Sequence, residues 1–91
     1  MTSDILHNGK KVVDMGINHL RETIAVFEAY QQLPTGLSKD KARLLPFLKV
    51  VLAIQEFCEA EFTRTNKKAV VPLELEEAFT KAEIVYHHER T

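Results

Sequence analysis

The sequence is poor in the residues that build disulfide frameworks, tight loops and nucleotide-binding turns. Its single cysteine, Cys58, excludes a disulfide within the chain and is typical of a protein in a reducing cytoplasm. Three glycines and three prolines leave room for few turns, and tryptophan is absent. The scattered glycines form neither a phosphate-binding loop nor a dinucleotide fingerprint. These absences favour a helical protein, and we expect no enzymatic activity and no cofactor.

An excess of charge of one sign is also missing. Twelve Lys and Arg residues against thirteen Asp and Glu give a formal net charge of −1, so the chain as a whole does not attract nucleic acid or anionic membrane. The N-terminus lacks the basic-then-apolar order of a signal peptide. The longest apolar run, Leu44 to Ile54, contains Lys49 and is shorter than the ~20 residues of a membrane span. We therefore expect a cytoplasmic protein without membrane contact.

The composition predicts one globular domain over residues 1–91. Hydrophobic residues make up 45% of the chain and charged residues 27%, which separates it from disordered proteins. A chain of this length buries roughly 60–70% of its unfolded surface, enough for a core without metal or disulfide support.

Apolar residues recur at helical spacing in three segments. The first predicts a helix from about Lys10 to Gln32, preceded by a turn at Asn8-Gly9. Its apolar stripe contains Val13, Ile17, Leu20, Ile24 and Phe27, and the same spacing extends back to Leu6. Pro34 and Gly36 then break the chain.

The second helix is expected from about Lys39 to Arg64, with Ser38 as its N-cap and Asn66 as its C-terminal cap. Pro46 lies too far inside this helix to be free of cost, so a kink or a restart near Leu45 is expected.

The third segment predicts a shorter helix that begins near Pro72 and has one apolar face. Proline suits the first turn of a helix because its missing N–H is not needed there. The resulting fold class is all-α: an antiparallel helical hairpin followed by a shorter C-terminal helix.

The middle of the second helix is apolar on more than one side. One stripe contains Leu44, Phe47, Val51, Ile54, Cys58 and Phe62. A second set points away from that stripe and consists of Leu45, Val50, Leu52 and Phe57. Because a single antiparallel neighbour would leave the second set in water, the pattern favours a homodimeric helical bundle with these four residues at its interface. A monomeric three-helix bundle stays open as the alternative.

Residues with possible metal or catalytic chemistry are few. Glu83 and His87 are four positions apart and could share a helix face as metal ligands, but adjacent His87 and His88 point in different directions. Solvent exposure near a helix C-terminus explains them without a metal. Cys58 has acidic neighbours and an apolar stripe around it, which favours a buried thiol over a nucleophile. We therefore predict no catalytic and no metal site.

Basic residues concentrate near two helix ends. In an antiparallel hairpin that starts at Lys10, Lys10 and Lys11 would lie beside Arg64, Lys67 and Lys68. Such a basic end could bind phosphates or an acidic partner, although aromatic residues do not alternate with these charges.

The surplus apolar face and the lack of chemical motifs together favour a non-enzymatic protein–protein interaction module, such as an adaptor, an inhibitor or a small regulatory subunit. Its expected partners are a second copy of itself and another protein. The alternative hypothesis is a nucleic-acid or anionic-partner binding protein that uses the basic end.

Overall fold

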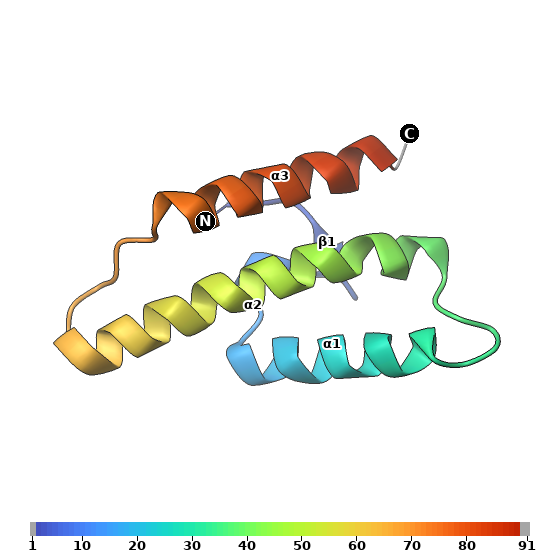
Figure 1. The fold of residues 1–91 in the computed structure, drawn as a ribbon, viewed down its shortest axis with the longest axis horizontal. Coiled ribbons are helices and arrows are strands. Elements are labelled where there is room, and N and C mark those ends of the chain that lie inside the picture. The colour runs from blue at the N-terminus through green and yellow to red at the C-terminus, as the bar shows by residue number, and fades with distance from the viewer. Residues whose placement is uncertain (1, 90–91) are drawn as a thin grey trace.

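The structure, a computed structural model, describes residues 2–89 and is mainly helical (Figure 1). Two short strands, β1 (Leu6–His7) and β2 (Lys10–Lys11), precede a 3-10 helix, η1 (Val12–Asp14). Three α-helices follow: α1 (Ile17–Gln31), α2 (Lys39–Thr65) and α3 (Leu73–Glu89). The three helices confirm the all-α prediction, whereas the two-stranded sheet was not expected. Within residues 2–89, no helix combines the length and apolar content needed to cross a membrane.

The first helix starts later than predicted, at Ile17 instead of Lys10. Asn8 and Gly9 have φ angles of 52° and 80°, and these left-handed residues form the tight turn of an antiparallel hairpin. His7 lies opposite Lys10 in this hairpin. Gly16 is extended and forms the N-cap of α1, so the apolar residues before it belong to a separate segment. The helical spacing continued into this segment by coincidence.

The predicted caps of α2 are confirmed. The Ser38 hydroxyl accepts a hydrogen bond from the Lys41 N–H at 3.4 Å, and Asn66 adopts a left-handed φ of 55° at the other end. Of the kink or restart predicted near Leu45, the restart is wrong, because α2 continues through Pro46. Pro46 and Ala42 are both exposed, so the carbonyl that loses its helical donor lies on the solvent side of the helix.

Helix α2 is the centre of the fold, with α1 and α3 packed antiparallel against it (Figure 1). Arg21 with Glu56, at 2.7 Å, and Glu28 with Lys49, at 3.4 Å, join α1 to α2. The segment before α1 contributes three buried apolar residues, Ile5, Val12 and Met15. The core therefore lies between three helices and this N-terminal segment.

This arrangement covers three of the four residues of the second apolar set of α2 within one chain. Leu45 is only 5% exposed, and Val50 and Leu52 are half-buried and pack against the core. Because α3 and the N-terminal segment both cover α2, its two-sided apolar pattern has neighbours inside the chain and no longer requires a partner chain.

Candidate functional site

Helix α3 is fixed to the core by one face. Phe79 is buried and its ring centroid lies 5.3 Å from that of Phe47 on α2. One end of the same face is held by Tyr86, whose ring lies 4.7 Å from the Arg43 guanidinium carbon, a cation–π contact. Leu75 and Ala82 also pack against the core. These contacts set the rotation of α3 about its axis and therefore determine which residues point outward.

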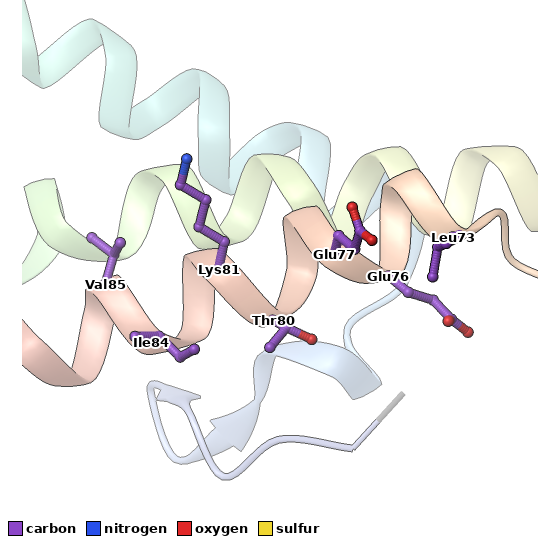
Figure 2. Close-up of a pocket in the computed structure, with 7 residues that line it drawn as sticks. All are labelled: Leu73, Glu76, Glu77, Thr80, Lys81, Ile84 and Val85. Carbon is purple, nitrogen blue, oxygen red and sulfur yellow. The ribbon is translucent and has the colours of Figure 1, made fainter.

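The opposite stripe of α3 carries apolar residues that have no place in the core. Leu73 is 67% exposed and Ile84 is 62% exposed. Figure 2 shows both on the outward side of α3, where the surface forms a shallow hollow of about 410 Å³. We call this surface the α3 outer face; it is formed by Leu73, Glu76, Glu77, Thr80, Lys81, Ile84 and Val85.

Charged residues flank the apolar positions of the α3 outer face. Glu77 and Lys81 lie one helical turn apart on the same edge, and both extend toward that edge in Figure 2. Among residues 2–89, neither has an ion-pair partner within 4.0 Å. Glu76 lies on the other edge of the stripe. The surface thus offers apolar contact and free charges of both signs.

A second apolar hollow, of about 440 Å³, lies between the C-terminal half of α2 and the chain that leads to α3. Exposed Phe62 and half-buried Cys58 line it together with Val71. Lys68 and Glu59 stand at its rim and have opposite charges.

The four interface residues expected from the sequence do not form one exposed face. Leu45 is buried, and Val50, Leu52 and Phe57 are half-buried. The exposed apolar residues of α3 were missed instead. One signal could have revealed them. Leu73 and Ile84 fall outside the stripe of Leu75 and Phe79, and their separation of about three helical turns places both on a second face of the helix.

The five basic residues expected to form one end lie at two ends of α2. Lys10 is opposite His7, whose ring contacts Phe27 near the end of α1, at 5.4 Å. That region adjoins the first turn of α2, because Lys41 lies 5.9 Å from the same Phe27 ring. Lys11 is the neighbour of Lys10 on β2, whereas Arg64, Lys67 and Lys68 lie at the C-terminal end of α2. The grouping was expected because the first helix was predicted to start at Lys10. In the structure Lys10 and Lys11 lie in the hairpin instead, and α1 starts at Ile17.

Two lysines and a histidine lie where the N-terminal hairpin meets α2. His7 and Lys41 both contact the Phe27 ring, and Lys10 lies beside His7. Partial burial lowers the pKa of His7 below its ordinary value of 6.5, and the nearby His19 and Lys41 lower it further. His7 is therefore mainly neutral near neutral pH.

The possible metal ligands do not form a cluster. Within the described range 2–89, no three His, Cys, Asp or Glu side chains are grouped so that they could hold an ion. Glu83 is half-buried, and the His87 ring lies edge-on to the Tyr86 ring at 5.4 Å.

Comparison with known proteins gives no match: no family model, no curated protein and no solved structure is similar to this chain. The candidate site must therefore be judged on its own groups. The α3 outer face presents aliphatic, carboxylate, hydroxyl and ammonium groups, a combination suited to apolar packing and ion pairing with another surface.

Proposed function

We propose that this protein is a non-enzymatic helical interaction module, of the kind found in adaptors, inhibitors and small regulatory subunits, and that the α3 outer face is its contact surface. The observation that carries this proposal is the exposure of Leu73 and Ile84 on a helix whose opposite face is packed against the core.

Exposed apolar side chains cost little as single residues, but they favour binding when a rigid element presents several of them together. Each square ångström of apolar surface removed from water contributes about 25 cal/mol. Phe79 and Tyr86 hold α3 in place, so a partner would not have to order the helix first. Apolar anchors with charged edges are the usual features of helix-mediated recognition. The single cysteine supports a cytoplasmic location as part of the same proposal.

The proposal is tested by affinity capture from cells that produce the protein, with wild type and two variants as bait. Ile84→Glu places a charge on the α3 outer face. Val26→Glu is the matched control, because Val26 is a helical apolar residue that is 51% exposed on α1. We expect a bound protein to be retained by wild type and Val26→Glu and lost with Ile84→Glu. Equal capture by all three baits would contradict the proposal.

A second candidate function, binding of an anionic partner such as nucleic acid, is favoured by the positive groups around Phe27. Lys41 lies 5.9 Å from the Phe27 ring, and Lys10 is paired on β2 with His7, whose ring also contacts Phe27. A gel-shift titration at several salt concentrations tests it, since phosphate contacts weaken steeply with salt. Lys10→Glu/Lys41→Glu should abolish binding, whereas Lys67→Glu/Lys68→Glu, at the far end of α2, should retain it. If Lys67→Glu/Lys68→Glu abolished binding and Lys10→Glu/Lys41→Glu retained it, the binding site would instead include Lys67 and Lys68, as the sequence predicted.

A further inference from the structure

We propose that the partner of the α3 outer face is a second copy of this chain, with the two α3 helices antiparallel across a two-fold axis near residue 79. This inference rests on the proposed function, because it uses the same contact surface and names its occupant. The argument uses the order of apolar and charged residues along the helix.

The apolar residues of the outer face are placed to meet each other in an antiparallel pair. With the axis near residue 79, a residue a given number of positions before it lies opposite the residue equally far after it. Leu73 is six positions before, and Val85 is six positions after, next to Ile84. Leu73 of each copy therefore packs against Ile84 and Val85 of the other. This contact occurs twice, once at each end of the interface, and covers the most exposed apolar residues of α3.

The charges follow the same symmetry. Glu77 is two positions before the axis and Lys81 two positions after it. In an antiparallel pair the same edge of each helix comes together, so Glu77 of one copy meets Lys81 of the other, again twice. Both residues extend along one edge in Figure 2 and, within residues 2–89, have no ion-pair partner within 4.0 Å. A parallel two-fold pair would instead bring opposite edges together and place Glu77 of one copy beside Glu76 of the other, which is unfavourable.

The ends of α3 agree with the antiparallel direction. Its first turn carries Glu74 and Glu76, and its last turn carries His87 and His88. An antiparallel pair brings the acidic turn of one copy toward the basic turn of the other, and it also opposes the two helix dipoles. A parallel pair would bring the two acidic first turns together.

The size of the surface determines how strong the dimer should be. Stable interfaces bury about 1,200–2,000 Å² in total, and weak ones bury less. One helix face from each copy belongs to the weak class, so we expect a dissociation constant of roughly 10–100 µM. Monomer and dimer should exchange rapidly at laboratory concentrations.

Sedimentation equilibrium of the full chain tests the association. Protein concentrations from 5 to 500 µM bracket the expected dissociation constant of about 10–100 µM. Wild type and the control Val26→Glu should show the same monomer–dimer equilibrium. Ile84→Glu should weaken the dimer about tenfold or more, because it places a charge against Leu73 of the other copy. Circular dichroism checks that the helical content is unchanged in each variant, which is expected because Ile84 and Val26 are exposed.

Charge reversal tests the register. Glu77→Lys and Lys81→Glu should each weaken self-association several-fold, because each creates like-charge contacts across the axis. Mixed together, the two variants should form a heterodimer at least as strong as wild type, since every contact then joins opposite charges. A mixture that associates no better than its components would overturn the antiparallel register.

Failure of this inference can be separated from failure of the proposed function. The second-copy proposal is overturned if the wild-type chain stays monomeric up to 500 µM, because that concentration exceeds the expected dissociation constant of roughly 10–100 µM. If Ile84→Glu then still abolishes capture of a cellular protein, the α3 outer face binds a different partner and the proposed function stands. If neither measurement responds to Ile84→Glu, both are rejected.

Discussion

The side-chain amide of Gln55 joins the middle of α2 to the main chain ahead of α1. Its Nε2 donates to the carbonyl oxygen of Met15 at 2.8 Å and also lies 3.3 Å from that of Val13. This contact satisfies two backbone acceptors, the carbonyl oxygen of Val13 in η1 and that of Met15 just after it. It also explains why residues 12–16 stay against the core although α1 starts only at Ile17.

We expect Gln55→Leu to destabilise the protein by about 1–3 kcal/mol, because it leaves part-buried carbonyl groups without a donor. The measurement is urea unfolding followed by circular dichroism. Gln31→Leu, at an exposed position on α1, is the control and should change the free energy of unfolding by less than about 0.5 kcal/mol. Equal effects of the two changes would show that the Gln55 contact is not stabilising.

The attachment of α3 depends on Phe79. Phe79→Ala removes a buried ring that packs on Phe47, and such truncations cost about 3–5 kcal/mol. We expect α3 to lose hydrogen-exchange protection before α1 and α2 do, because α3 has few other buried residues. Thr80→Ala, the exposed neighbour, should leave the exchange pattern unchanged. Simultaneous loss of protection in all three helices would instead indicate a single cooperative unit.

The features that the sequence predicted correctly are those determined by neighbouring residues. Ser38 and Asn66 cap α2 through hydrogen bonds and dihedral angles within one helical turn, so their residue types are sufficient evidence. Asn8-Gly9 indicated a turn for the same reason. The sequence could not show that the chain before Gly16 folds back as a hairpin, because Val13 and Leu6 happen to continue the helical spacing of α1.

The candidate site depends on contacts between distant parts of the chain, which local patterns do not contain. Leu45 was expected at an interface because α2 has apolar residues on several sides, and only the placement of α3 and the N-terminal segment shows that it is buried. Conversely, Leu73 and Ile84 are exposed because Phe79 and Tyr86 rotate α3 toward Phe47 and Arg43. The sequence predicted the number of helices but not which apolar face would be left over.

Backbone conformation at the hairpin gives a further prediction. Gly9 has a φ of 80°, which strains any side chain, so Gly9→Ala should destabilise the protein by about 1 kcal/mol. Gly16 is extended at the N-cap of α1, and a Cβ there would meet no atom within 4 Å. Gly16→Ser should therefore be neutral or stabilise the protein by a few tenths of a kcal/mol, since serine is a favourable N-cap. Thermal unfolding of both variants measures the contrast, and a larger loss for Gly16→Ser would show that its conformation has been misassigned.

His7 should make the stability of the protein depend on pH. Its pKa in the folded chain is lowered from the ordinary value of 6.5, first by burial and then by His19 and Lys41, so the unfolded chain binds the proton more readily. The contribution of His7 to stability is therefore complete above pH 6.5, decreases as the pH falls through the folded-state pKa, and is constant below it.

The variant His7→Phe isolates this effect, because it keeps an aromatic ring against Phe27 but cannot be protonated. Urea unfolding between pH 8 and pH 5, a range that brackets the ordinary histidine pKa of about 6.5, gives the free energy of unfolding for both proteins. We expect the difference between the two free energies of unfolding to be constant above pH 6.5 and to shift in favour of His7→Phe as the pH falls. The variant Lys41→Met tests the effect of Lys41 on the pKa of His7. Removal of that positive charge should reduce the pH dependence of the wild-type histidine. A parallel pH profile for wild type and His7→Phe would show that the ring of His7 is protonated as readily in the folded chain as in the unfolded one.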